Sequence, residues 1–572
     1  MISVSNFKGI IPKLADKLLP NSHASDAINC DLKEGQIKPT KAASSEFNLA
    51  VGTKTIHRLS DQWLQWTNVI DVVQSLIYES GSRIIYTGDG YPKETNAVLA
   101  IAGASTYPDA SRRLGIDAPT VKLSYSVTVV GTGTDRSIAY VYTRIAIWAD
   151  GSVVESSPSL PTEVFTAKDD ATVKLTNFVD TSEDGVYTTH YRIYRINTGN
   201  TGAEYQYVAD LIKTASPLEY DDTVLDADLG EVLPATDWTF PIDDLQGIVG
   251  ASNGLLFAHS DNKIYVCDTY ISYTFPSKYA LSVDSKVMGL GYSGNAVIVL
   301  TKTRPYMIFG IDPASLSIEQ LPYDLPCVST RSIVNTPKGV IYASNTGLIL
   351  ISSSGGVSNL TEDLYTPAQW QALEPIGIFA FFFNDAYLMF FDDTKSGIEV
   401  PLNELRVRKV ETADAVYGGA YVSTVNANSY DLLDSDSKNF LTANGYQFVV
   451  SGDTYSLTLD TLYLIQKKEA ISEIVAWEGG SLQDYTWESK VFHAPFKDVF
   501  TFGMIVGNYT EGTVDLSFYV DGTLSFTKTV SDSDIFNFPA VKRGSTYKFK
   551  VVGKTAIDQV IIGQSVLEVL NG

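Results

Sequence analysis

Residues 253–266 read NGLLFAHSDNKIYV, a sequence in which two short apolar runs are separated by the polar pair Asp261-Asn262. Such runs, bounded by residues that tolerate a positive φ, are typical of β-hairpins. The pattern continues to Phe391, and a turn pair begins each unit: Asn253-Gly254, Gly294-Asn295, Lys338-Gly339 and Asn384-Asp385. These turns are about 41, 44 and 46 residues apart, close to the roughly 40–50 residues of a four-stranded propeller blade. The spacing predicts an all-β chain built on a β-propeller. A β-sandwich with coincidental spacing is the alternative.

Length and composition indicate several β-rich domains. A chain of 572 residues is too long for one core, and its 33 Tyr and 42 Gly suit an all-β protein with many turns. The formal net charge of −24 argues against nucleic-acid binding through a basic patch. A negatively charged wall would instead let duplex DNA slide past without sticking. Only 19% of the residues are charged, which hints at surface covered by partners.

The first 118 residues are expected to contribute two parts. Residues 1–45 are predicted to form an extended N-terminal segment, because Pro12, Pro20 and Pro39 favour an extended path. This segment would either close the propeller ring or reach a neighbouring subunit. Residues 46–118 are predicted to form the first part of the propeller, with a hairpin turn at 80–82.

Three further domains follow in the prediction. Residues 119–237 have the short strand-like runs of an inserted immunoglobulin- or fibronectin-like β-sandwich. Residues 238–475 are expected to supply the remaining blades, with one short helix within 361–373 and a weaker strand pattern at 430–433. Residues 476–572 alternate strongly again and predict a C-terminal β-sandwich of jelly-roll type.

No catalytic arrangement is found, so we expect neither enzymatic activity nor a cofactor or metal site. The pairs Asp221-Asp222 and Asp243-Asp244 were weighed as carboxylates of a glycosidase, but adjacent residues in a strand point to opposite faces. The cysteines are far apart and are predicted to be small buried residues. The histidines are scattered. These residues are Cys30, Cys267 and Cys327, and His23, His57, His190, His259 and His493.

Two short basic clusters are expected to be a solvated face or an intersubunit salt bridge rather than phosphate contacts: Arg112-Arg113, and Arg406, Arg408 and Lys409. The N-terminal residues 1–14 lack the pattern of a secretion signal, and the apolar run 376–383 is too short to span a bilayer. We therefore expect a soluble protein made in a cytoplasm.

Short motifs occur in a fixed order along residues 1–350 and thinly thereafter. In the N-terminal segment they are Phe7-Lys8-Gly9, Leu19-Pro20, Ala27-x-Asn29 and Gly35-x-Ile37-x-Pro39. Around the insertion they are Arg113-Leu114-Gly115-Ile116-x-Ala118-Pro119, Tyr140-Val141-Tyr142-Thr143, Glu155-Ser156-x-Pro158-Ser159, Leu229-Gly230-Glu231-x-Leu233 and Trp238. In the repeat they are Gly247, Asn253-Gly254, Thr301, Arg304-Pro305-Tyr306, Gly310, Cys327-Val328-Ser329-x-Arg331-Ser332-Ile333-Val334 and Tyr342-Ala343-Ser344-x-x-Gly347-Leu348. The C-terminal third adds Trp487-x-Ser489-Lys490-x-Phe492.

In this order the motifs resemble tail nozzle or tail-tube (tail hub) proteins of short-tailed, podovirus-like bacteriophages. The resemblance implies a structural virion protein whose propeller-built subunits form a closed homo-oligomeric ring, typically a hexamer, in the virion tail. Such a ring is assembled in the host cytoplasm below the portal and adaptor proteins. It extends the channel for double-stranded DNA, retains the genome until ejection, and carries tail fibres or a needle. Which loops line or gate the lumen is not indicated by the sequence.

Two other classes of protein were considered. A receptor-binding or carbohydrate-degrading tail protein is the alternative, because propellers and jelly rolls host both activities. The dispersed positions of the seven Trp residues argue mildly against a sugar-binding platform. A bacterial surface adhesin would need an export signal.

Overall fold

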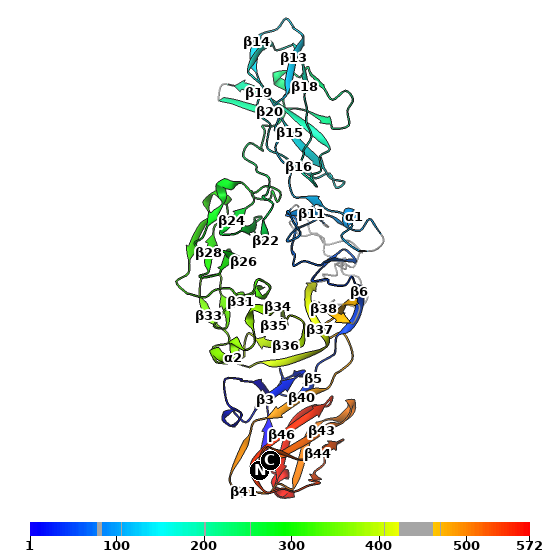
Figure 1. Ribbon diagram of the computed structural model, residues 1–572, viewed down its shortest axis with the longest axis vertical. Helices are drawn as coiled ribbons and strands as arrows, with labels where there is room; N and C mark the ends of the chain where they lie inside the picture. Colours follow the sequence, from blue (N-terminus) through cyan, green and yellow to red (C-terminus); the bar gives the residue numbers. More distant parts are fainter. Residues whose placement is uncertain are drawn as a thin grey trace, which may run out of the picture.

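The computed structural model describes residues 1–76, 83–103, 106–199, 202–251, 253–404, 406–422, 461–468 and 471–572. The predicted turn at 80–82 and the strand pattern at 430–433 lie outside these ranges. Figure 1 shows three β-rich parts along the long axis: a sandwich at the top, a propeller in the middle and a second sandwich at the bottom. The all-β prediction with a propeller is confirmed.

Five blades of the propeller come from consecutive hydrogen-bonded strands. All four predicted turn pairs connect the first and second strands of a blade, and Asn384 and Asp385 take the positive φ values of 50° and 61° that such turns require. The first blade contains β9 (Asp71–Gln74), β10 (Ile84–Thr87), β11 (Lys93–Thr95) and β12 (Arg112–Arg113). The second contains β22 (Gln246–Gly250), β23 (Leu256–Ser260), β24 (Lys263–Val266) and β25 (Leu281–Ser282). The third contains β26 (Val287–Ser293), β27 (Ala296–Thr301), β28 (Tyr306–Phe309) and β29 (Ser317–Gln320). The fourth contains β30 (Val334–Thr336), β31 (Gly339–Ala343), β32 (Leu348–Ile351) and β33 (Val357–Asn359), and the fifth contains β34 (Ile378–Phe383), β35 (Ala386–Phe391), β36 (Thr394–Pro401) and the start of β37 (Arg408–Val422).

The ring closes through strands from both ends of the chain. The second half of β37 pairs with β38 (Thr461–Lys468), which pairs with β39 (Ile471–Ala476), and β6 (Ser44–Leu49) from the N-terminal region completes this blade. The hairpin of β7 (Thr55–Leu59) and β8 (Gln62–Trp66) lies between the last blade and the first. Its Trp63 packs with Ile465 and Ile474 on one side, whereas Trp66 packs with Tyr86 on the other. An N-terminal strand therefore closes the ring, although only Ser44 and Ser45 of β6 belong to the segment 1–45 that was predicted to close it.

The inserted sandwich contains nine strands within the described residues. One sheet has the order β16-β15-β19-β20, a second has the order β13-β18-β21, and β14 pairs with β17. Aromatic and branched side chains such as Tyr140, Tyr142 and Ile193 fill the core between them. The strands are β13 (Ser124–Val129), β14 (Asp135–Ile138), β15 (Tyr140–Ile147), β16 (Val153–Glu155), β17 (Phe165–Lys168), β18 (Thr172–Thr176), β19 (His190–Gly199), β20 (Gly202–Ile212) and β21 (Tyr220–Asp222).

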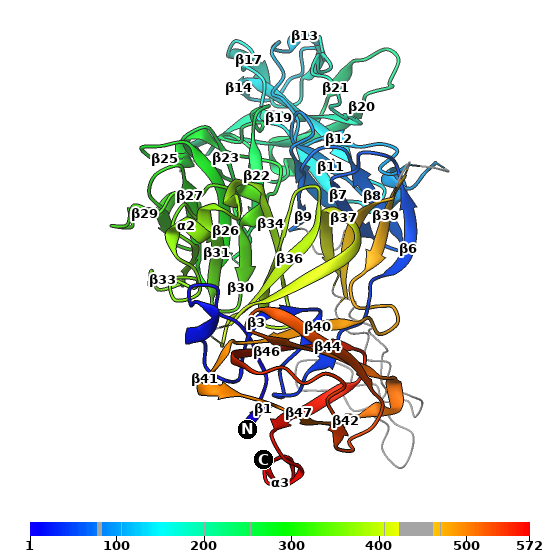
Figure 2. The same ribbon diagram turned by 60° about the horizontal axis from the view of Figure 1, so that its bottom comes forward.

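The second sandwich is built from both termini, and here the structure differs from the prediction of a separate N-terminal segment. β1 (Ile2–Ser5) pairs with the C-terminal strand β47 (Ala556–Gly563), β2 (Lys8–Ile10) pairs with β3 (His23–Ile28), and β3 pairs with β40 (Tyr485–Ser489). Figure 2 shows the two termini side by side on this sandwich. Its other elements are β4 (Cys30–Asp31), β5 (Lys38–Pro39), β41 (Phe492–Asp498), β42 (Phe502–Asn508), β43 (Val514–Val520), β44 (Thr523–Val530), β45 (Phe536–Asn537), β46 (Gly544–Gly553) and α3 (Val566–Leu570).

Helices are short in the described part of the chain. The helix predicted within 361–373 is α2 (Pro367–Gln371), where Thr366 and Gln369 form a capping box and Pro367 occupies the first turn. The other two short α-helices of the described residues are α1 (Ala97–Ala100), capped by Asn96, and α3, capped by Ser565. Among the described residues, the search for a helix long and apolar enough to cross a membrane finds none.

Candidate functional site

The chain leaves the first blade for the inserted sandwich through one of the quoted motifs, residues 113–119. Gly115 has a φ of +80°, and a Cβ atom there would lie 2.6 Å from the carbonyl oxygen of Tyr273. Only glycine accepts both the left-handed backbone and this close approach. The motif thus turns the chain tightly against the second blade before it enters the sandwich.

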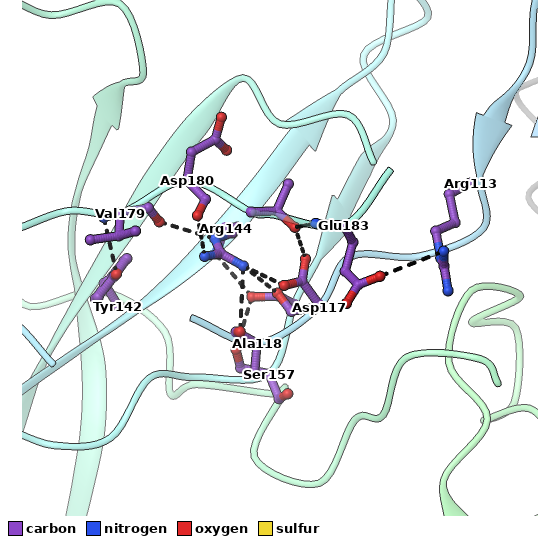
Figure 3. Close-up of polar contacts among 11 residues, drawn as sticks. Arg113, Asp117, Ala118, Tyr142, Arg144, Ser157, Val179, Asp180 and Glu183 are labelled. Atoms are coloured by element: carbon purple, nitrogen blue, oxygen red, sulfur yellow. Dashed lines mark hydrogen bonds and ion pairs between the residues drawn. The ribbon is translucent and has the colours of Figure 1, made fainter. Parts of the chain in front are cut away.

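Arg144 of β15 is the centre of the polar contacts on the sandwich side (Figure 3). It is 1% exposed, and its Nη1 lies 2.8 Å from Oδ2 of Asp117. The same guanidinium donates to the carbonyl oxygens of Val179 (3.1 Å) and Asp180 (2.7 Å). One side chain therefore ties the incoming chain to a loop of the sandwich, and its planar fork fixes their relative orientation.

Arg113 makes the matching contacts on the propeller side. Its Nη1 lies 3.7 Å from Glu183 of the sandwich, and its Nη2 pairs with Asp243, which precedes the second blade. The guanidinium also lies over the rings of Tyr91 (4.6 Å) and Phe240 (4.4 Å). Arg113 therefore joins three segments that are far apart in sequence.

A tryptophan of the sandwich inserts into the first blade. Trp148 lies at the turn after β15, is 4% exposed, and is flanked by the guanidinium groups of Arg83 (4.2 Å) and Arg112 (4.1 Å). Arg83 is fully buried and lies 3.6 Å from the buried carboxylate of Glu94. Burial raises the pKa of Glu94 to about 7, although Arg83 and Arg112 act in the opposite direction.

We call this set the upper joint: Arg83, Glu94, Arg112, Arg113, Asp117, Arg144 and Trp148. Apolar residues on both sides, including Ile85, Leu114 and Val154, pack in the same cluster as Trp148. The arrangement holds a domain at a fixed angle. It offers no base beside a nucleophile, as acyl or glycosyl transfer would need.

The structure corrects the interpretation of the basic clusters. Arg112-Arg113 are neither a solvated face nor free for another subunit, because Arg113 is 6% exposed and both contact groups within this chain. Arg408 is likewise buried, pairs with Glu399 and donates to the carbonyl oxygen of Cys30 (2.9 Å). Both clusters therefore join parts of one chain.

The aspartate pairs do not converge. Asp222 is buried and bonds to Tyr140 (2.6 Å) and Arg195 (2.5 Å), whereas Asp221 on the other face lies 3.4 Å from Lys174. Asp243 pairs with Arg113, and Asp244 accepts a hydrogen bond from Ser260. Cys30, Cys267 and Cys327 are free and buried, as predicted. Within the described ranges, no group of three or more His, Cys, Asp or Glu side chains is placed to hold a metal ion.

A cavity of about 580 Å³ lies among the innermost strands β9, β22, β26 and β30. Asp71 is exposed toward this cavity, and partial desolvation by the surrounding protein raises the pKa of its carboxyl to about 6. His259 also lines it, and burial lowers the pKa of the imidazole to about 4. Asp71 is the one carboxylate among the lining residues, so the described cavity wall lacks the carboxylate pair of a glycosidase.

Sequence reasoning missed most of the upper joint. The partners of Arg144 lie 27 to 36 positions away, and neither periodicity nor spacing indicates such contacts. One signal was available, because Arg113 begins a quoted motif, although that motif leaves the position of Asp117 open. Nothing in a single sequence indicates that Trp148 and Glu94 belong to the upper joint.

No protein-family model and no curated protein matches the chain. Among solved structures, Sqt1 of Saccharomyces cerevisiae is 11% identical, with a TM-score of 0.29 over 76% of this chain and 99% of that protein. AztD from Citrobacter koseri is 10% identical, with a TM-score of 0.27 over 61% and 94% of the two chains. An exo-β-1,3-galactanase from Phanerochaete chrysosporium is 8% identical, with a TM-score of 0.20 over 91% and 99%. Likenesses with such low TM-scores carry no argument, so the propeller assignment rests on this chain's own strand pairing.

Proposed function

We propose that this chain is a subunit of the ring-shaped tail nozzle of a short-tailed bacteriophage, located in the virion tail. In this role the ring extends the DNA channel below the portal and adaptor, retains the genome and carries fibres or a needle. The proposal rests on the order of the quoted motifs. The observation that supports it best is that one of them, residues 113–119, contributes Arg113 and Asp117 to the upper joint.

A wall element of a channel under pressure must keep its shape along its whole length. The upper joint fixes the inserted sandwich through buried side chains, and the N-terminal strand β3 connects the propeller to the second sandwich by pairing with both β37 and β40. Stiffness of this kind suits a structural subunit.

Charge supports the same role. With a net charge of −24, a ring of such subunits repels phosphate, so duplex DNA would pass through its lumen without being held by the wall. The guanidinium groups of Arg113 and Arg144 in the upper joint are paired within the chain and are not available for phosphate.

Light scattering and electron microscopy of the purified protein and of tails test the proposal. We expect a closed ring, typically of six copies, with a hole wide enough for duplex DNA, and no retention of duplex DNA by the ring at low salt. A protein that stays monomeric at every concentration and is absent from virions would overturn the proposal. Cleavage of a polysaccharide by that monomer would instead support the carbohydrate-degrading alternative.

A further inference from the structure

The cavity among β9, β22, β26 and β30 holds a carboxylate that has no cation beside it. Asp71 of β9 is exposed toward the cavity and interacts with the backbone N–H of Gly247. No charged group of the described residues lies close enough to shift the pKa of this carboxyl. A partly desolvated carboxylate without a cation is costly, so a cation bound in the cavity would stabilise it.

His259 reaches the same part of the cavity wall from β23, the second strand of its blade. Opposite His259, β22 is bulged between Gln246 and Val249, and Gly247 in the bulge has a φ of +64°. A Cβ atom on Gly247 would lie 2.6 Å from Nε2 of His259, so the glycine leaves room for the imidazole. Gly247 therefore brings the Asp71 carboxylate and the His259 ring to one place in the wall.

The surroundings of His259 decide which ring nitrogen carries the proton. Burial lowers the pKa of the imidazole to about 4, so the ring is neutral at pH 7. His259 is 7% exposed, and its buried Nδ1 has no hydrogen-bond partner among the described residues. Buried N–H groups without an acceptor are rarer in proteins than acceptors without a donor. The proton is therefore assigned to Nε2, which lies beside Gly247 and can donate to a ligand in the cavity.

We propose that this cavity binds a small organic cation, in which a primary ammonium group pairs with Asp71 and a nearby hydroxyl or carbonyl oxygen accepts a hydrogen bond from Nε2 of His259. The cavity volume of about 580 Å³ falls within the roughly 300–1,000 Å³ of small-molecule sites. The net charge of −24 raises the concentration of cations near the chain. This site lies within one subunit and does not depend on the proposed ring.

A metal ion fits the same residues poorly. Asp71 is the one carboxylate among the lining residues, whereas Mg²⁺ and Ca²⁺ prefer several oxygen ligands. A transition metal on Nε2 of His259 would move the ring proton to Nδ1, for which the described residues offer no acceptor. Histidines that bind metals almost always donate their other ring N–H to an acceptor. An organic cation leaves the ring proton where it is.

Three probes test the proposal on the wild-type protein by isothermal titration calorimetry at pH 7.5 and low salt. Ethanolamine carries both an ammonium group and a hydroxyl, ethylamine lacks the hydroxyl, and ethylene glycol lacks the charge. We expect ethanolamine to bind most tightly, ethylamine to bind about threefold to tenfold more weakly, and ethylene glycol not to bind in the same range. Ethylene glycol that binds as tightly as ethanolamine would overturn the proposal, as would the absence of ethanolamine binding. Displacement of ethanolamine by an equal concentration of Mg²⁺ would identify a metal site and overturn it too.

Two variants locate the bound ethanolamine. Asp71→Asn keeps the shape of the side chain and removes its charge, so the affinity for ethanolamine should fall about tenfold or more. The matched control is Asp324→Asn, which removes one exposed carboxylate outside the cavity and should leave the affinity unchanged. His259→Leu should abolish the preference for ethanolamine over ethylamine. Equal affinities of Asp71→Asn and the wild type would overturn the site.

The pH dependence of ethanolamine binding gives a readout that needs no variant. Asp71 and His259 are the titratable groups that line the cavity, and Lys286 acts on His259. Partial desolvation raises the pKa of Asp71 to about 6, whereas exposed aspartates titrate near about 4. Because the cation binds the ionised carboxylate, its affinity should fall as the pH drops through about 6, where His259 is still neutral. An affinity that falls only near pH 4 would place the amine on surface carboxylates and overturn the cavity site.

Discussion

The propeller is attached to its two sandwiches by different physics. At the upper joint, buried guanidinium groups set the contacts: Arg144 with the partly exposed Asp117, and Arg83 with the buried Glu94. The lower joint consists of the sheet that runs from β37 through β3 to β40, with one apolar cluster reaching from Tyr387 of the propeller to Trp487 of the second sandwich. Apolar residues line both joints, and the lower one also holds a buried pair, Arg408 with Glu399, but it adds strand pairing through β3 to that pair.

We therefore expect the lower joint to contribute stability and the upper joint to fix the orientation of the inserted sandwich. Apolar burial is non-directional and contributes most of the free energy of folding, so the lower joint should unite the propeller and second sandwich into one cooperative unit. A buried ion pair adds little net stability, because desolvation offsets the attraction, but it penalises every other arrangement of the two parts. The upper joint should therefore fix an angle and separate more readily. Four substitutions test this contrast.

The largest effect is expected at the lower joint, from Trp487→Ala. Trp487 is fully buried, its ring packs edge-on against Phe7 at 4.9 Å, and its Nε1 donates to the carbonyl oxygen of Lys8. Removing a buried aromatic ring costs about 3–5 kcal/mol. Chemical unfolding should show this loss in a single transition that includes the propeller.

The control for this change is Phe496→Ala, since Phe496 is 81% exposed in β41 of the same sandwich. We expect it to change the free energy of unfolding by less than about 0.5 kcal/mol. Separate transitions of the propeller and the second sandwich in Trp487→Ala would contradict a single cooperative unit.

At the upper joint, Arg144→Met should release the inserted sandwich without unfolding the propeller. The methionine keeps much of the apolar stem but removes the cation beside Asp117 and the donor to the carbonyl oxygen of Asp180. Breaking a fully buried pair costs about 3–5 kcal/mol, and the cost is less here because Asp117 is partly exposed and keeps its hydrogen bond from Thr181. Limited proteolysis should cut the connections at 114–119 and 229–238 faster. Arg304→Met, which removes an exposed pair with Asp324, should leave both rates unchanged. A lower melting temperature of the propeller itself would contradict the localised role.

Trp148→Leu should have a smaller effect of the same kind. Leucine retains apolar burial, but the contacts with Arg83 and Arg112 are lost, and each is worth about 0.5–2 kcal/mol. The control is Trp63→Leu, because Trp63 is also buried under an arginine but lies in the β7–β8 hairpin. Hydrogen exchange of β12 should increase in Trp148→Leu and not in Trp63→Leu. Equal increases in both variants would show that Trp148 supports the whole fold and not the joint.

The sequence predicted the parts of this fold whose determinants are local. Asn384-Asp385 marked a hairpin because these residues tolerate positive φ, and the helical spacing of Leu364, Ala368 and Ala372 with Pro367 near its start marked a short helix. The blade period could be measured from such turns alone.

Both joints escaped prediction because they are made by distant residues. The N-terminal segment was expected to close the ring or reach a neighbouring subunit, and the pairing of β3 with β40 was not predicted. Strand β40 lies more than 450 residues later, and pairing at that distance depends on register that composition does not indicate. Arg113 was interpreted as a surface charge because charged residues are rarely buried without a partner. Its partners Glu183 and Asp243 come together only after folding.

The smallest effect concerns pH and the Arg83–Glu94 pair. The groups that face Glu94 are Arg83, Arg112 and Asp150, and the net result is a pKa of about 7, above the ordinary 4.5. Between these two values the folded state binds more protons than the unfolded state, so the free energy of unfolding of the joint falls as the pH rises from about 5 to 7. The free energy of unfolding changes by at most about 1.4 kcal/mol for each pH unit between the two pKa values. Glu94→Gln should remove this slope.

The wild type also contains buried histidines with the opposite tendency. Burial lowers the pKa values of His57 and His259 to about 4, and such groups stabilise the fold as the pH rises. The informative quantity is therefore the difference between Glu94→Gln and wild type at each pH, measured by proteolysis of 229–238. Glu163→Gln, at an exposed carboxylate of the sandwich, should show no such difference. If Glu94→Gln follows the wild-type curve from pH 5 to 8, the Glu94 carboxylate of the wild type stays ionised throughout this range. The upper joint would then hold its angle with a permanent Arg83–Glu94 charge pair, and ionisation of Glu94 would not loosen it.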